Sequence, residues 1–260
     1  MNLVADDIRM GSFESQAAPR TETASPRLAG IPPNSEIRLE EERIKQLRQV
    51  LRAVAYPGSS VREVLGREIG PAHLRVDLPL YLRRLRAPAK LNTLVKLFAL
   101  GVRVPEAEAR AALAPLGLED ASALGLIESG PRGVRPRIGI SVCDNLFLIH
   151  DCHNEDAANL RPDYVLGVNP AALSLAHLTV RRPVRSVLDI GTGCGIQALL
   201  AARHSERVVA VDTNPRALRL ARLNARLNGL GNVDCWLGNL FGPVAGRRFD
   251  LIVCNPPYVI

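Results

Sequence analysis

The 260-residue sequence predicts an α/β fold in which a small helical domain precedes a parallel sheet with crossover helices. Three observations support this class. From residue 186 onward, short apolar segments alternate with helical periodicity in the order strand, helix, strand, helix, strand, strand. A glycine-rich turn follows the first of these strands. Hydrophobic residues make up 47% of the chain, which is enough to bury a core.

The N-terminal part begins with a polar stretch and continues with helices. Residues 1–35 are rich in Ser, Thr, Ala and Pro and show no apolar periodicity, so we expect a flexible tail. Apolar residues at helical spacing, with capping residues at the starts and glycine or proline at the stops, predict five short helices. They run from Ile37 to a stop at Tyr56-Pro57-Gly58, from Ser60 to near Gly66, over Ala89–Leu100, from Pro105 to about Leu116, and near Glu119–Leu124.

A hairpin is predicted after these helices. Apolar residues alternate with Gly and Ser over Ile138–Val142, and Asp144-Asn145 can turn the chain into a second strand over Leu146–Ile149. Helices followed by a hairpin resemble a winged-helix module, and a helical cap that packs on the main domain is the alternative. We therefore expect one domain over residues 36–160 and a second over residues 161–260.

The second domain is predicted to contain four strands. Asn214 and Pro215 are suited to begin a helix, and Asn228-Gly229 is suited to end it. The expected elements are a helix over Pro170–Leu178, a strand over Val187–Ile190, a helix from the glycine-rich turn to about His204, a strand over Arg207–Val211, the helix between Asn214 and Gly229, a strand over Val233–Leu237 and a strand over Phe249–Cys254.

The glycine-rich turn follows Asp189-Ile190 and has glycine at 191, 193 and 195. Alternating glycines let the backbone turn sharply and approach a ligand closely. The dinucleotide-binding pattern would need a further glycine at 196, where Ile stands. The next strand ends at Asp212, whose carboxylate can accept hydrogen bonds from both hydroxyls of a ribose. An anion at a helix N-terminus is the alternative role of this side chain.

The fourth strand ends in Asn255-Pro256-Pro257-Tyr258. Two successive prolines remove two backbone donors and stiffen the chain. They can present the Asn255 amide oxygen and the Pro256 carbonyl as two acceptors facing one point, where the two hydrogens of a planar NH₂ group would fit. Tyr258 offers a flat face on which the target can stack. A proline-rich turn without chemistry is the alternative.

With these residues in place, the sequence resembles the class I S-adenosylmethionine-dependent methyltransferases, in the branch whose N-P-P-Y tetrad methylates exocyclic or amide nitrogens. The resemblance covers residues 165–260 and implies a Rossmann-like core. It implies catalytic roles for Asn255, Pro256, Pro257 and Tyr258. It also implies that S-adenosylmethionine is bound by Asp189, Gly191, Thr192, Gly193, Gly195, Asp212 and Asn239. Asn239 stands where many relatives carry an aspartate for the adenine amine.

The family sheet has seven strands, and strands one to four are the ones found in this sequence, which stops two residues after the tetrad. Strand four would then be an open edge. We expect that the chain is a fragment or a truncated form, or that a partner completes the sheet.

The substrate predicted first is an RNA base, because the chain has a net charge of +7, a pI of 9.6 and an appended N-terminal domain. A protein glutamine side chain is the close alternative, since the same tetrad serves both, and a DNA adenine is third. A non-catalytic cofactor-binding or RNA-binding fragment is the alternative from another class. The arginines at 216, 219, 222 and 226 recur at helical spacing, where a solvated helix face is favoured over a binding patch.

Other features exclude further classes. No apolar run approaches the ~20 residues of a membrane-spanning helix, and the N-terminus lacks the pattern of a secretory signal. Five scattered cysteines favour reduced thiols in a cytoplasmic protein. The run His150-Asp151-Cys152-His153 lacks zinc spacing, so we predict no metal.

Overall fold

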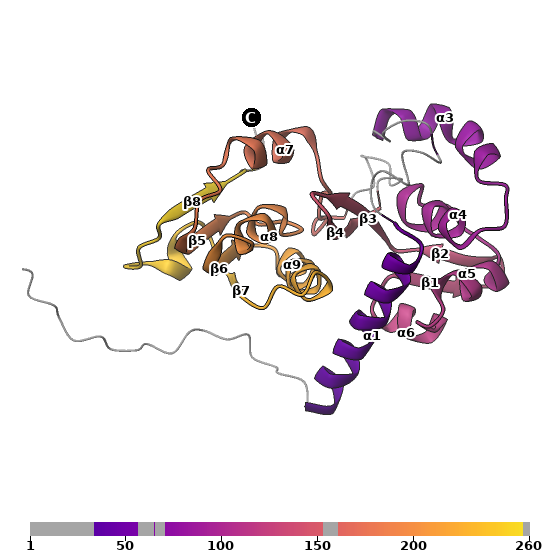
Figure 1. Cartoon of the computed structure of the whole chain (residues 1–260), viewed down its shortest axis with the longest axis horizontal. Helices are drawn as coiled ribbons and strands as arrows, with labels where there is room; N and C mark the ends of the chain where they lie inside the picture. Colours follow the sequence, from indigo (N-terminus) through magenta and orange to yellow (C-terminus); the bar gives the residue numbers. More distant parts are fainter. Residues whose placement is uncertain (1–33, 57–64, 66–70, 153–160, 257–260) are drawn as a thin grey trace, which may run out of the picture.

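The computed structural model describes residues 34–56, 65, 71–152 and 161–256 (Figure 1). The predicted tail and the predicted helix between Ser60 and Gly66 lie outside these ranges, apart from residues 34, 35 and 65. The first helix already begins at Asn34, so it takes in the last two residues of the predicted tail. No helix within the described ranges has the length and apolar character needed to cross a membrane.

The N-terminal elements are helices followed by two antiparallel hairpins (Figure 1). Helix α4 continues without a break into a π-helical turn, η1, and Gly101 follows with a φ of 67°. The elements are α1 (Asn34–Ala53), α3 (Pro71–Arg84), α4 (Lys90–Leu94), η1 (Val95–Ala99), α5 (Glu106–Leu113), α6 (Leu118–Ala123), β1 (Ile127–Gly130), β2 (Gly133–Pro136), β3 (Ile138–Cys143) and β4 (Leu146–Asp151).

The predicted β3–β4 hairpin is confirmed. Ile140 pairs with Ile149 and Val142 with Phe147, and the two turn residues Asp144 and Asn145 both have positive φ. Asparagine and aspartate tolerate this conformation, and two such residues form the turn that matches the twist of a hairpin.

Helix α3 and the β1–β2 hairpin were not predicted from the sequence. Pro79 lies inside α3 and hides its helical pattern, because proline normally ends a helix. The β1 and β2 strands have four residues each, and Ile127 and Val134 are their only branched aliphatic side chains, so no alternating pattern is visible.

The C-terminal elements form a four-stranded parallel sheet in the order β7-β6-β5-β8. In sequence order this is 3-2-1-4, the start of the doubly wound arrangement. The predicted α/β fold is therefore confirmed. The elements are α7 (Pro170–Leu178), β5 (Val184–Ile190), α8 (Ile196–Ala202), β6 (Ser205–Asp212), α9 (Pro215–Leu227), β7 (Val233–Leu237), the 3₁₀ turn η3 (Gly242–Val244) and β8 (Leu251–Cys254).

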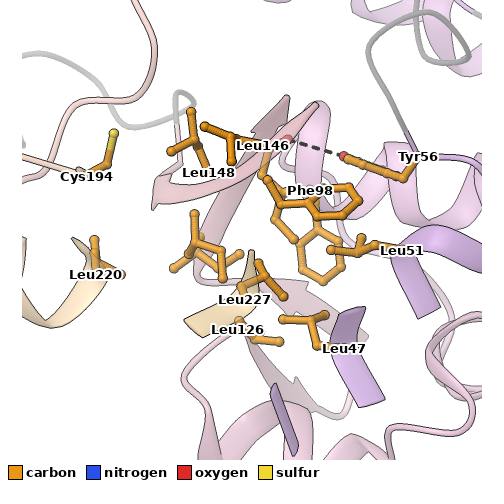
Figure 2. Close-up of a cluster of buried hydrophobic side chains, with 14 of the residues drawn as sticks. Leu47, Leu51, Tyr56, Phe98, Leu126, Leu146, Leu148, Cys194, Leu220 and Leu227 are labelled. Carbon is orange, nitrogen blue, oxygen red and sulfur yellow. Dashed lines mark hydrogen bonds between the residues drawn. The ribbon is translucent and has the colours of Figure 1, made fainter. Parts of the chain in front are cut away.

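Alternate residues of the strands belong to two clusters of buried side chains, as expected when both faces of a sheet are covered. Val187 and Val208 join a large cluster with α8 and α9, whereas Leu188 and Val209 join a smaller one with Trp236. The large cluster extends into the N-terminal elements. Figure 2 shows its members from α1 (Leu47, Leu51), the hairpin (Leu146, Leu148) and α9 (Leu220, Leu227).

Hydrogen bonds also hold this core together, within the N-terminal elements and between them and α9. Tyr56 donates its hydroxyl to the Ile140 carbonyl at 3.4 Å, as the dashed line in Figure 2 marks. Arg48 of α1 donates Nε to the Leu227 carbonyl at 2.7 Å, where the last carbonyls of α9 need partners. The N-terminal elements are thus held against α9, which also packs on the sheet.

Candidate active site

The predicted ligand-binding loop and the predicted tetrad begin at the same level on neighbouring strands. Ile190 of β5 pairs with Cys254 of β8, so Gly191 and Asn255 are the next residue on each strand. A Cβ atom at Gly191 would lie 3.9 Å from the Asn255 carbonyl oxygen. The carboxyl ends of parallel strands are where α/β proteins bind their ligands.

The glycine-rich loop needs glycine for two different reasons. Gly195 has a φ of 91°, and a Cβ there would lie 3.2 Å from Cα of Ala221, so it allows α8 to start close against α9. Gly193 has a φ of 55°, and a Cβ there would meet nothing within 4 Å. The backbone at Gly193 therefore faces open space that a ligand can fill.

Asp189, near the end of β5, holds this loop through hydrogen bonds. Its side chain is 1% exposed, and Oδ2 accepts hydrogen bonds from the Thr192 hydroxyl at 2.6 Å and from the Ala198 amide at 3.0 Å. Burial raises the pKa of Asp189 to about 6. These two donors belong to the loop and the first turn of α8, so Asp189 and Thr192 shape the loop. Their direct contact with a cofactor stays a prediction.

Asp212 lies across the loop at the end of β6. Its Oδ2 accepts from the Gly193 amide at 2.9 Å, and its Oδ1 accepts from the Asn214 amide at 2.9 Å. Each carboxylate oxygen can accept a second bond, and the side chain is partly exposed, so the donor set fits a ligand that offers a pair of hydroxyls. The cap of α9 is Asn214, whose Oδ1 accepts from the Arg216 amide at 2.9 Å. Asp212 is thus not needed as that cap.

Asn239 lies at the same end of the sheet as Asp212, beyond the carboxyl ends of the strands. The Gly238 amide donates to the Asp212 carbonyl at 3.0 Å, which places the turn after β7 next to the end of β6. Asn239 is exposed, and its carbonyl accepts from the Gly242 amide at 2.9 Å. The contact of its side chain with an adenine amine stays a prediction.

The tetrad is described only in part. Asn255 is partly buried and Pro256 is exposed. Pro257 and Tyr258 lie outside the described residues. The predicted pair of acceptors and the predicted stacking face therefore remain predictions, supported by the position of Asn255 beside Gly191.

The arginine stripe on α9 is largely used inside the protein. Arg216 forms an ion pair with Asp151, Arg222 donates to the Cys235 carbonyl at 2.6 Å, and Arg226 lies 3.5 Å from Glu40. Three of the four arginines therefore bond to other residues of the chain, so their helical spacing does not by itself indicate a phosphate-binding patch.

The His150-Asp151 pair also bonds internally. His150 Nε2 lies 2.8 Å from the Ser141 hydroxyl, and its Nδ1 lies 2.7 Å from the Asp151 carbonyl. Within the described ranges, no group of three or more His, Cys, Asp or Glu side chains is placed to hold a metal ion.

Sequence reasoning missed one buried polar residue beside the loop. Asn224 of α9 is 0% exposed and donates to the Cys194 carbonyl at 2.8 Å. The available signal was a pair of asparagines, 224 and 228, four residues apart on an otherwise apolar helix face.

Two segments of the chain match known protein families. Residues 169–260 match the family described as Methyltransferase small domain, and residues 53–137 match a domain of unknown function, DUF7059. The C-terminal part of the chain is therefore similar to the methyltransferase small domain, and it has the α/β fold of the class I methyltransferases.

Two curated proteins that are similar to this chain are named glutamine methyltransferases. The chain is 43% identical over 94 residues to the release factor glutamine methyltransferase of Xylella fastidiosa, covering 35% of this chain and 33% of that protein. It is 46% identical over 79 residues to the ribosomal protein uL3 glutamine methyltransferase of Bradyrhizobium diazoefficiens, covering 29% and 25%. Among solved structures, a ribosomal protein L11 methylase from Lactobacillus delbrueckii is 32% identical with a TM-score of 0.32, covering 37% of this chain and 51% of that chain.

The chain spans a third or less of the length of these two curated relatives. Their names do not support the RNA base that the basic charge favoured. They support the alternative, a glutamine side chain of a protein.

Proposed function

We propose that this chain is an S-adenosylmethionine-dependent N-methyltransferase whose target is the side-chain amide nitrogen of a glutamine in a protein. One observation carries the proposal. Asn255 lies beside the glycine-rich loop, on the neighbouring strand. The relatives that match this part of the chain are named for glutamine methylation. The N-P-P-Y tetrad is part of this proposal.

The loop and Asp212 form the proposed cofactor half of the site. The open backbone at Gly193 and the two carboxylate oxygens of Asp212 fit a ligand with an apolar or amino-acid portion and a ribose. S-adenosylmethionine, when bound there, supplies a methyl group on a positively charged sulfur. Gly191, Gly193 and Gly195 would let the backbone approach it, and Asn239 would accept from the adenine amine.

The tetrad forms the proposed acceptor half. The Asn255 amide oxygen and the Pro256 carbonyl would accept the two hydrogens of the glutamine NH₂ group, which fixes its plane and orients the nitrogen lone pair. Pro257 would hold this turn rigid, and Tyr258 would stack on the amide plane. Orientation of this kind is where most of the rate acceleration is expected, because a methyl on a sulfonium is already electrophilic.

The test is transfer of a labelled methyl group to purified release factors and ribosomal proteins, with total RNA as the comparison substrate. We expect incorporation into protein, located at a glutamine by peptide mass analysis. Incorporation into RNA alone would support the RNA alternative, and cofactor binding without transfer to either would support the non-catalytic alternative.

The matched variant is Asn255→Ala. It removes one of the two acceptors without touching the residues proposed to hold the cofactor. We expect transfer to fall by about 100-fold, the loss typical of a misplaced reactant, while the cofactor dissociation constant stays within about twofold. Equal losses of binding and transfer would contradict the division of roles between the two halves.

A further inference from the structure

Strand β4 runs along helix α9, and two asparagine side chains take the place of a neighbouring strand. Asn228 accepts from the Phe147 amide at 2.9 Å and donates to the Phe147 carbonyl at 2.7 Å. Asn224, one helical turn earlier, accepts from the Ile149 amide at 2.8 Å and donates to the Ile149 carbonyl at 2.9 Å. The edge of β4 that is not paired with β3 is thereby paired by side-chain amides.

The two asparagines differ in the acceptor of their second amide hydrogen. Asn228 donates it to the Asn224 carbonyl at 2.7 Å, within α9. Asn224 donates it to the Cys194 carbonyl at 2.8 Å, within the glycine-rich loop. Asn224 is therefore the member of the pair that touches both the hairpin and the loop.

Asn224 is buried, so its hydrogen bonds cannot be replaced by bonds to solvent. Asn224 is 0% exposed, and both of its amide hydrogens and its oxygen are used. Removing it leaves the Ile149 amide and two carbonyls without that partner in a buried region, which costs more than the bonds themselves contribute. Cys194 directly precedes Gly195 in the loop. The Gly195 amide in turn donates to the Thr192 carbonyl at 2.8 Å.

We propose that Asn224 is a positioning residue that couples the β3–β4 hairpin to the cofactor loop, so that docking of the hairpin and ligand binding at the loop favour each other. The proposal rests on the proposed function for the identity of the ligand. Its physical basis is that a loop already held in its binding conformation does not lose ordering free energy when the ligand binds.

The first experiment compares Asn224→Ala with Asn228→Ala. Both variants remove a side-chain pair with β4, and Asn224→Ala alone removes the bond to the loop. We expect lower melting temperatures for both. By calorimetry, the dissociation constant for S-adenosylmethionine should rise about tenfold for Asn224→Ala and by less than about twofold for Asn228→Ala. Equal affinities in the two variants would overturn the proposal.

Amide hydrogen exchange provides a readout that needs no ligand. In the free protein, the Gly195 amide should exchange about tenfold faster in Asn224→Ala than in Asn228→Ala, because its loop has lost the Cys194 contact. Equal exchange rates at Gly195 would contradict the coupling. If the wild-type chain does not bind S-adenosylmethionine, the proposed function fails, while this exchange comparison still decides the coupling.

The wild-type protein offers a further test should Asn224→Ala not fold. The Ile149 amide donates to Asn224 and the Phe147 amide donates to Asn228, so one sample contains both the probe and its control. Added S-adenosylmethionine should slow exchange at Ile149 several-fold more than at Phe147, since coupling is reciprocal. Equal slowing at both amides would contradict the proposal.

Discussion

The carboxyl ends of β5 and β8 lie side by side but are held very differently. The loop after β5 is fixed by the buried Asp189, by Asp212 and by Asn224. The end of β8 pairs with β5 on one side, and no further strand pairs with it in the part of the chain that the structure describes. Ile252 on β8 is 49% exposed.

This difference indicates how the two halves of the proposed site are built. The cofactor half is preorganised by hydrogen bonds from three elements of this chain, whereas β8, which leads into the acceptor half, has only β5 as a neighbour among the described strands. Changes at the loop should therefore affect both stability and ligand binding. Changes at the end of β8 should affect methyl transfer with little effect on stability.

The largest expected effect comes from Gly195→Ala. The φ of 91° is unfavourable for alanine, and its Cβ would lie 3.1 Å from Cβ of Ala221 and 2.9 Å from Cδ1 of Leu199. We expect a loss of about 2–4 kcal/mol in the free energy of unfolding, measured by denaturant titration.

The matched change on the other strand is Ile252→Ala. Because this side chain is half exposed, we expect a loss below about 1 kcal/mol. Similar losses in the two variants would break the contrast between a preorganised loop and a lightly held strand end.

A pH-dependent effect, intermediate between those two, is expected at Asp189. Its pKa is raised from the ordinary value of 3.8 to about 6, so the folded state holds this proton more tightly than the unfolded state. Its contribution to stability is therefore favourable below about pH 4 and is lost as the pH rises to about 6. Relative to Asp189→Asn, the wild-type protein should lose about 2 kcal/mol of unfolding free energy between pH 4 and pH 7.

Urea titrations of both proteins at several pH values measure this difference. The asparagine variant keeps an oxygen that can accept from the Ala198 amide, so it serves as a near-isosteric reference. A wild-type-minus-variant difference that does not change with pH would show that Asp189 titrates as an ordinary carboxyl group.

The sequence predicted the sheet and the loop well because their signals are local. Gly191 to Gly195, Asp212, and the cap at Asn214 and Pro215 each follow directly from a strand end or a helix start. Helix α3 was missed because Pro79 interrupts its pattern. The role of Asn224 could not be predicted, because its partners lie 75 and 30 residues away in the chain.

Substrate choice was the weakest prediction from the sequence. Net charge is a property of the whole chain, and three of the four arginines in the α9 stripe bond within the protein. Charge that is used in this way carries little information about a nucleic-acid partner. The tetrad alone serves both amide and exocyclic amine targets, so it left the choice open.

The most direct test of the account is calorimetric titration of S-adenosylmethionine into the wild-type chain, Asp212→Ala and Asp234→Ala. Asp234 is the matched control, since it is an exposed aspartate on β7 that pairs with Arg207 at 2.8 Å. We predict binding by the wild type and Asp234→Ala, and a dissociation constant raised by about 100-fold or more in Asp212→Ala, which would lose the two proposed hydroxyl contacts and the observed Gly193 bond. A folded Asp212→Ala protein that binds as tightly as the wild type would contradict the placement of the cofactor at the ends of β5 and β6.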